Sequence, residues 1–221
     1  MCGRFSLFTN EEILKDEYSL DSIPKLSEKY NIAPGQNLPI ILFDEELNRN
    51  TLFLAHWGFI PSWVKEIKEV TKPINARYET LEEKPYFRSS FSRQRCLIPA
   101  NGFFEWDKRT KPGTPFHFHL ENNKLFSFAG LWSKWKGNNE ETIISCTLIT
   151  TNANSLISPI HDRMPVILQK ENYKKWLNPD SQIKEIKYML ESRIINGLEA
   201  HEVSRVVNSP SNDSADCIKP I

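Results

Sequence analysis

The 221-residue sequence contains no apolar run of the roughly 18 residues that a membrane-spanning helix needs. Its first residues lack the basic and then apolar plan of a secretory signal peptide. No glycine- and serine-rich linker divides the chain, and no internal repeat is visible. We therefore expect a cytoplasmic protein without a membrane partner, built as a single domain over residues 1–208. Residues 209–221, which are rich in small polar side chains and proline, are expected to form a flexible C-terminal tail.

Cysteine is scarce, and neither sign of charge is in excess. The four cysteines show no CxxC spacing, so neither a zinc site nor a disulfide framework is indicated, and we expect no metal and no cofactor. Cys96 and Cys146 stand in apolar runs and are expected to be buried thiols. Lys and Arg number 28, as do Asp and Glu, so the formal net charge is zero. This argues against bulk electrostatic binding of nucleic acid and leaves a local basic patch over residues 72–95 as the candidate.

The hydrophobic pattern predicts an α+β fold that is predominantly antiparallel β, with a curled, barrel-like sheet core and a few peripheral helices. Strand-like runs occupy residues 4–8, 38–43, 51–59, 95–107, 115–120, 125–135, 142–150 and 199–204. The run at 95–107 is interrupted at 99–102, which suggests a bend or bulge. Helices are expected from a capping box at Thr9 to about Tyr18, over a short stretch at 74–80, and at 171–177 and 181–190.

Cys2 directly follows the initiator methionine, which cells usually remove before a small residue. Cys2 would then carry an α-amine and a thiol on adjacent carbons. Such a 1,2-aminothiol condenses with an aldehyde to an imine and closes a five-membered thiazolidine ring, and the thiol alone can also attack a carbonyl. Unperturbed pKa values of about 7.7 for the amine and about 8.5 for the thiol leave both partly reactive near neutral pH. The alternative is a small hydrophobic residue that begins a strand.

Two other side chains are candidates for proton transfer. Glu105 lies among aromatic residues, and burial would raise its pKa enough for a proton shuttle near neutral pH. Strand alternation equally allows it to face outward. His161 stands in a loop shaped by Pro159 and Pro165, where a histidine suits acid and base catalysis. A surface histidine in a turn is the alternative.

Further polar and aromatic residues stand where they could bind or orient a ligand. Asn75 and Arg77 begin the expected helix at 74–80, where Arg77 suits a phosphate and Asn75 suits either a helix cap or a substrate contact. Trp63 follows a proline in a polar loop and is expected to be an exposed stacking platform. His117 and His119 have the spacing of a metal-binding pair, but without a third ligand in view the spacing does not indicate a metal site.

Six motifs in one order carry a resemblance. They are Met1-Cys2-Gly3-Arg4-Phe5, Asn31-Ile32-Ala33-Pro34-Gly35-Gln36, Trp57-Gly58-Phe59-Ile60-Pro61-Ser62-Trp63, Asn75-Ala76-Arg77-Tyr78-Glu79-Thr80, Arg95-Cys96-Leu97-Ile98-Pro99-Ala100-Asn101-Gly102-Phe103-Phe104-Glu105-Trp106 and His161-Asp162-Arg163-Met164-Pro165. Together they resemble the SOS-response-associated peptidase (SRAP) family of abasic-site-processing proteins, over about residues 2–207. A Trp-Gly-Phe run replaces the commoner Trp-Gly-Leu of the family, a change that affects packing more than chemistry.

The resemblance implies an enzyme that shields abasic sites in single-stranded DNA or at single-strand to duplex junctions. Cys2, freed of Met1 by autoproteolysis or by an aminopeptidase, would form a thiazolidine crosslink with the ring-opened sugar. The resemblance makes Asn75 an orienting residue, Glu105 the proton carrier at the amine, and His161 the group that assists ring opening. It assigns DNA contacts to Arg4, Trp63, Arg77 and Arg163. It also implies a monomer at the nucleoid that acts without a metal.

Two other function classes remain open from the residues alone. An amidotransferase with an N-terminal cysteine nucleophile also begins with Cys-Gly, and Asn101-Gly102 would then resemble its oxyanion site. A single-strand-binding module without covalent chemistry is the non-enzymatic alternative. Its binding would be reversed by salt and would survive Cys2→Ala.

Overall fold

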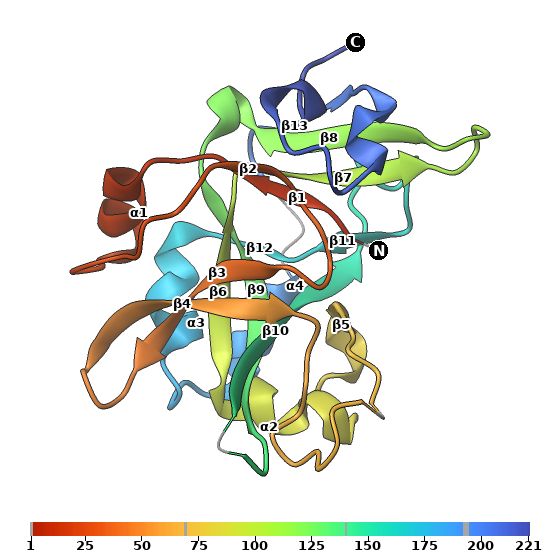
Figure 1. Ribbon diagram of the computed structural model, residues 1–221. Coiled ribbons are helices and arrows are strands. Elements are labelled where there is room, and N and C mark those ends of the chain that lie inside the picture. Colours follow the sequence, from red (N-terminus) through yellow and green to blue (C-terminus); the bar gives the residue numbers. More distant parts are fainter. Residues whose placement is uncertain (1, 69, 140, 192–194) are drawn as a thin grey trace.

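The computed structural model describes residues 2–68, 70–139, 141–191 and 195–221. Within these ranges the chain forms two sheets that meet near its beginning (Figure 1). One is an antiparallel five-stranded sheet in the order β13-β8-β7-β1-β2. Its strands are β1 (Phe5–Leu7), β2 (Lys29–Ile32), β7 (Gly102–Asp107), β8 (Thr114–Leu120) and β13 (Leu198–Glu202).

The second sheet closes on itself. Its ring consists of β3 (Asn37–Asp44), β4 (Arg49–Trp57), β6 (Arg95–Ala100), β9 (Phe126–Lys136) and β10 (Thr142–Asn152). The neighbours pair antiparallel except at β4 and β10, whose parallel pairing completes the ring. Three short strands extend it, β5 (Asn75–Arg77), β11 (Arg163–Pro165) and β12 (Ile167–Leu168). The predicted α+β class with a curled, mainly antiparallel core is confirmed.

Alternation along the barrel strands separates the two largest of the core clusters. Ile40 and Ile98 face inward, together with Cys2, Phe5 and residues of the five-stranded sheet. Ile41 and Leu97 face outward and are covered by helices. The helices are α1 (Glu11–Tyr18), α2 (Pro85–Arg93), α3 (Tyr173–Leu177) and α4 (Ile183–Glu191). They lie around the barrel, as Figure 1 shows, and none in the described ranges is long and apolar enough to span a membrane.

Most of the predicted elements are present. The helix predicted after Thr9 is capped by Asn10, whose Oδ1 accepts a hydrogen bond of 2.8 Å from the Ile13 amide. The predicted strand at 95–107 is two strands, because the chain passes from the barrel (β6) to the five-stranded sheet (β7) at Asn101. Cys96 and Cys146 are buried thiols, as predicted.

One expectation from the sequence is corrected, and one helix is additional. Residues 75–77 are not a helix start but a strand, β5, because they pair in parallel with β10; the helical part is a single 3-10 turn, Tyr78–Thr80. The helix α2 was not predicted, although Pro85 at its first turn is a recognised start signal.

The C-terminal segment, predicted to be a flexible tail, is packed against the five-stranded sheet. Cys217 is fully buried with Phe104 and Val203. The Asp213 carboxylate accepts hydrogen bonds from the amides of Tyr30 and Asn31. Composition alone suggested disorder, but a buried thiol and an aspartate that satisfies two backbone amides hold this segment in place.

Candidate active site around Cys2

Cys2 lies just before β1, where the barrel and the five-stranded sheet meet, and its side chain is fully buried. Its Sγ lies 3.7 Å from the carbonyl oxygen of Arg4. Burial, with the nearby charge of Glu105, raises the pKa of the Cys2 thiol, so at neutral pH the sulfur is protonated. A base must therefore accept the thiol proton before the sulfur can act as a nucleophile.

Asn75 holds the backbone of Cys2. Its Nδ2 donates a hydrogen bond of 2.8 Å to the Cys2 carbonyl oxygen. The strand β5 positions this amide, because Asn75 pairs with Leu148 of the central strand β10. The Asn75 Oδ1 is buried and accepts no hydrogen bond from the described residues. This oxygen is therefore a candidate acceptor for a donor on Cys2 or on its substrate.

Glu105 is the carboxylate of the site. It lies on β7, opposite Phe116 of β8, and is only 4% exposed. The pKa of Glu105 is raised to about 7, chiefly by burial, with a lowering contribution from Lys108 and a raising one from Asp162. Both protonation states are populated near neutral pH, as a proton carrier requires. The inward-facing alternative for Glu105 is the one observed, because Phe104 and Trp106 turn to the opposite face of the sheet.

His161 lies in the turn between β10 and β11, and 8% of its side chain is exposed. The Arg163 amide donates a hydrogen bond of 3.0 Å to His161 Nδ1, and Asp162 Oδ1, an acceptor, lies 3.0 Å from the same nitrogen. The bond from Arg163 favours a proton on Nε2 and the contact with Asp162 favours one on Nδ1, so these two partners do not fix the tautomer of the neutral ring. Burial lowers the pKa of His161, and the Lys108 charge lowers it further against the opposing effect of Asp162. The ring is therefore mostly uncharged at neutral pH, with one nitrogen that donates and one that accepts.

The four predicted catalytic side chains belong to one site. Asn75 bonds to Cys2, and the charge of Glu105 acts on the Cys2 thiol. Lys108 and Asp162 shift the pKa values of both Glu105 and His161, which places all of these groups in one electrostatic neighbourhood. The sequence pattern gives no sign of Lys108, because its position just beyond β7 does not show that its charge acts on His161.

The predicted DNA-contact residues differ in how they are placed. Arg77 is exposed on β5, two residues from Asn75. Trp63 is 61% exposed and meets the Tyr86 ring edge to face at 6.0 Å. Both are available to a ligand, as expected. Trp63, however, lines a groove of about 1090 Å³ with residues of β3, α2 and β9, and none of the four candidate catalytic residues lines that groove.

Arg163 and Arg4 are engaged within the protein. The Arg163 guanidinium is buried and bonds to both oxygens of Glu79, at 2.6 and 2.9 Å, and to Asn152 and Thr150. Arg4 Nη1 donates to Asn31 Oδ1 and to the carbonyl of Val207, both at 2.8 Å. These contacts and its 7% exposure leave the Arg163 side chain no surface for a phosphate. We therefore assign Arg163 a structural role.

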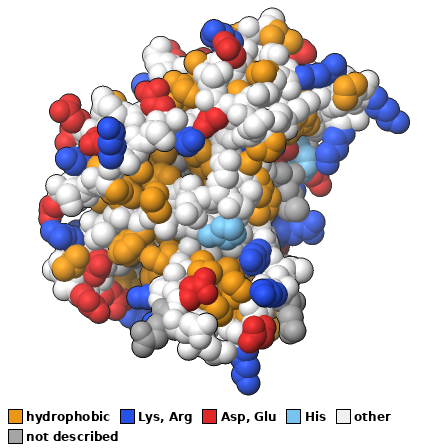
Figure 2. Space-filling view, in the orientation of Figure 1, with side chains coloured by type: hydrophobic (Ala, Val, Ile, Leu, Met, Phe, Trp, Pro, Cys, Tyr) orange, Lys and Arg blue, Asp and Glu red, His pale blue; other side chains and the backbone are white. Residues whose placement is uncertain are grey.

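The basic patch expected at residues 72–95 is smaller than the sequence suggests. Arg95 is 2% exposed and donates to the carbonyl oxygens of Phe91, Ser92, Trp176 and Asn178. Arg93 pairs with Glu45 and Asp180. On the face in Figure 2, basic and acidic side chains of the described residues are interspersed, in keeping with zero net charge.

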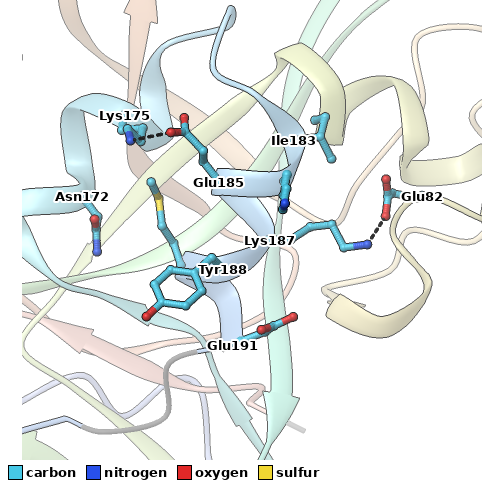
Figure 3. A pocket seen from close by; sticks show the side chains of 10 residues that line it. Glu82, Asn172, Lys175, Ile183, Glu185, Lys187, Tyr188 and Glu191 are labelled. Atoms are coloured by element: carbon cyan, nitrogen blue, oxygen red, sulfur yellow. Dashed lines mark hydrogen bonds and ion pairs between the residues drawn. The ribbon is translucent and has the colours of Figure 1, made fainter.

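Two other features do not support a competing site. A pocket of about 910 Å³ beside α4 contains the ion pairs Lys175–Glu185 and Lys187–Glu82 (Figure 3), and no candidate catalytic residue lines it. Asn101 accepts from the Phe8 amide and donates to the Asn123 carbonyl. Its amide therefore fixes the crossing between the sheets and is not directed at a substrate, which weakens the amidotransferase alternative.

Comparisons with known proteins agree with this geometry. The family model for the SOS response associated peptidase (SRAP) matches residues 1–210. The chain belongs to the SRAP family. It is 43% identical to the abasic site processing protein YoqW of Bacillus subtilis, over 99% of each chain. It is 30% identical to the abasic site processing protein HMCES of Xenopus tropicalis, over 89% of this chain and 67% of that one.

The fold of this SRAP chain also matches solved structures. A crystal structure of a protein from Bacteroides thetaiotaomicron superposes with a TM-score of 0.88 at 27% identity and covers both chains completely. A protein from Bordetella bronchiseptica superposes with a TM-score of 0.79 at 24% identity, over 92% of this chain and all of the other, and shares the fold.

Proposed function

We propose that this SRAP protein recognises abasic sites in single-stranded DNA and at single-strand to duplex junctions, and links them covalently to Cys2. The observation that carries the proposal is the placement of Cys2, with its carbonyl held by Asn75 and a carboxyl of pKa about 7 beside its thiol. The relatives named as abasic site processing proteins support the substrate class. The protein acts as a monomer at the nucleoid, and the crosslink shields the lesion until it is repaired.

The chemistry begins with the closed sugar of the abasic site. As the ring opens to an aldehyde, the anomeric hydroxyl gives its proton to the neutral imidazole of His161, and the imidazolium returns a proton to the ring oxygen, which becomes a hydroxyl group. Cys2, without Met1, presents its α-amine, and ionised Glu105 removes a proton from the ammonium form. The amine adds to the aldehyde carbon, and protonated Glu105 returns the proton to the hydroxyl group, which leaves as water.

The thiol then completes the ring. Glu105, ionised again, accepts the proton of the Cys2 sulfur, and the sulfur adds to the imine carbon. The nitrogen takes a proton as the C=N bond becomes single, so the net reaction joins aldehyde and aminothiol with loss of one water. The thiazolidine holds the former aldehyde carbon through one C–N bond and one C–S bond. It resists hydrolysis better than an imine does, which suits a long-lived shield.

The reaction requires removal of Met1, because the peptide bond to Met1 makes the Cys2 nitrogen an amide. Attack by the chain's own groups and ordinary aminopeptidase processing both satisfy this requirement. The family name suggests the first route. Mass spectrometry of protein made by a translation system without aminopeptidase distinguishes the two.

The test uses the mature protein and a single-stranded oligonucleotide with one abasic site. After incubation, a denaturing gel should show a heat-stable shifted band that is lost with Cys2→Ala or after methoxyamine treatment of the DNA. Cys2→Ser keeps the amine and should give a product that survives only after borohydride reduction of the imine. Glu105→Gln should slow adduct formation, and Lys184→Ala on the exposed face of α4 serves as the control.

Absence of a shifted band with verified Met-free protein would overturn the proposal. A non-covalent binding module would instead give a complex that salt dissociates and that Cys2→Ala leaves intact. Glutamine hydrolysis without a DNA adduct would favour the amidotransferase alternative.

A further inference from the structure

Three of the five histidines in the sequence meet on the five-stranded sheet. His117 and His119 lie on β8, and His201 lies opposite His117 on β13. Each offers a ring nitrogen, and these atoms lie within 4.8 Å of one another. The cluster is separate from the candidate active site, because His117 pairs with Phe104, the neighbour of Glu105, and neighbours on a strand face opposite sides.

Backbone carbonyls fix the tautomers of two of these rings. His119 Nδ1 lies 2.9 Å from the Leu120 carbonyl oxygen, and His201 Nε2 lies 2.8 Å from the Ile218 carbonyl oxygen. A carbonyl oxygen only accepts, so both of these nitrogens must carry protons. In neutral rings the other two nitrogens, His119 Nε2 and His201 Nδ1, therefore both carry lone pairs. These two nitrogens lie only 3.0 Å apart. Two lone pairs at that distance require a cation or an extra proton between them.

The third ring supplies a further lone pair. His117 is fully buried, and its Nε2 lies 3.2 Å from the hydroxyl of Ser6, which itself donates to the Gly102 carbonyl. The Ser6 oxygen therefore accepts from His117 Nε2–H, and the lone pair is on Nδ1. That Nδ1 is buried and has no hydrogen-bond partner among the described residues. An unsatisfied buried nitrogen costs free energy, and a bound cation would remove this cost.

We propose that His117, His119 and His201 bind a transition-metal ion, with zinc the best match. Three neutral imidazoles plus one water make a common tetrahedral zinc shell. Nitrogens bound to one zinc at about 2.0–2.1 Å are roughly 3.3 Å apart, close to the observed 3.0 Å between His119 and His201. Each ligand ring donates its other N–H to a carbonyl or hydroxyl oxygen, as ligands of zinc sites usually do.

Such an ion would fasten the C-terminal segment to the sheet. It joins β8 to β13, and the His201 ring is in turn bonded to Ile218, beside the buried Cys217. The site also explains the small residue at position 102. A Cβ on Gly102 would lie 2.1 Å from His117 Nε2 and would displace that ring.

The test measures zinc uptake without DNA, so its result is independent of the crosslinking reaction. The full-length protein is stripped with a chelator, dialysed against zinc chloride and analysed for metal by mass spectrometry. We expect about one zinc per chain, and a rise in Tm of about 5 °C or more at saturating zinc. His119→Gln and His201→Gln should each weaken zinc binding at least tenfold, because each removes one imidazole ligand. Both positions are half-buried and accept a polar amide, so both variants should fold.

Matched variants of the two remaining histidines give the controls. His56→Gln on β4 should keep the zinc, and so should His161→Gln unless the ion binds beside Cys2. If a ligand variant fails to fold, the wild-type protein is loaded with cobalt instead of zinc. Cobalt in a tetrahedral site with nitrogen ligands absorbs strongly in the visible range, so this absorption would support the proposed site and its absence would contradict it. Lack of stoichiometric zinc in the wild type would overturn the proposal and favour a proton shared by His119 and His201. Equal zinc uptake in every variant would also overturn it.

Discussion

The side-chain amide of Asn75 donates a hydrogen bond of 2.8 Å to the backbone carbonyl of Cys2, across 73 positions of sequence. Asn75 is itself fixed by the pairing of β5 with β10, so the position of Cys2 depends on the barrel. The reactive amine and thiol of Cys2 would therefore approach a substrate from a preset direction. Preorganisation of this kind lowers the barrier without any further contact to the substrate.

Loss of the Asn75 amide should slow crosslinking. Asn75→Ala removes the donor to Cys2, and a net hydrogen bond of about 1 kcal/mol corresponds to a roughly fivefold to tenfold lower rate. Single-turnover adduct formation measures this effect. Asn139→Ala, in an exposed turn, should react at the wild-type rate. An unchanged rate for Asn75→Ala would mean that the Cys2 carbonyl needs no anchor.

Glu105 should make the protein less stable as pH rises. Burial raises its pKa in the folded state to about 7, from an ordinary value near 4.5. The native state then binds the proton more tightly than the unfolded state, so this contribution is present below about pH 4.5 and is lost between about pH 4.5 and 7. The loss is on the order of 3 kcal/mol. Urea unfolding at pH 5 and pH 7.5 should show it in the wild type, and Glu105→Gln should lack this part of the pH dependence.

Arg77 should contribute a phosphate contact. Arg77→Ala is expected to weaken binding to single-stranded DNA and to reduce the slope of log K against log salt by about 0.7, as for one phosphate. Fluorescence anisotropy at several salt concentrations measures both, with Cys2→Ala as the background to prevent crosslinking. The control Lys184→Ala should keep the wild-type slope. A slope that Arg77→Ala leaves unchanged would contradict the phosphate role.

Arg163 should matter for stability. Arg163→Ala leaves the Glu79 carboxylate, the Asn152 oxygen and the Thr150 carbonyl without their guanidinium partner. Loss of this buried guanidinium, whose Nη1 and Nη2 atoms are bonded while Nε is not, should cost about 3 kcal/mol. Thermal unfolding should therefore show a Tm lower by about 6 °C or more. A normal Tm together with a shallower salt dependence of DNA binding would instead show that Arg163 contacts a DNA phosphate.

Retention of Met1 should abolish the adduct although the thiol of Cys2 is intact. A chain with Met1 in place, verified by mass spectrometry, has an amide where the proposed reaction needs an amine. The denaturing gel should show no crosslink until an aminopeptidase has removed Met1. A heat-stable band from the Met1-bearing chain would show that the sulfur alone reacts.

Much of the fold was predictable because patterns within short segments specify many of its strands and helices. The alternation in β8, β9 and β10 and the cap of α1 are properties of short segments. The role of residues 75–77 was not predictable in this way. Their conformation as a strand depends on β10, about 70 residues later in the chain.

The candidate site shows the same division. The motifs singled out Cys2, Asn75, Glu105 and His161, and the structure gathers them in one neighbourhood. The same motifs did not distinguish the exposed Arg77 from the buried Arg163, since both are arginines in motifs of similar character. The difference lies in Glu79 and Asn152, which the fold brings to one of them.

The α+β class, the family resemblance and the chemistry available at Cys2 were predictable from the sequence, because they follow from residue types at fixed local spacing. Which side chains meet depends instead on the packed fold. It paired Asn75 with Cys2, turned Glu105 inward, and brought His201 to within 3.0 Å of His119 across 82 positions. Strand register between distant segments sets these contacts, and register depends on the packing of the whole core.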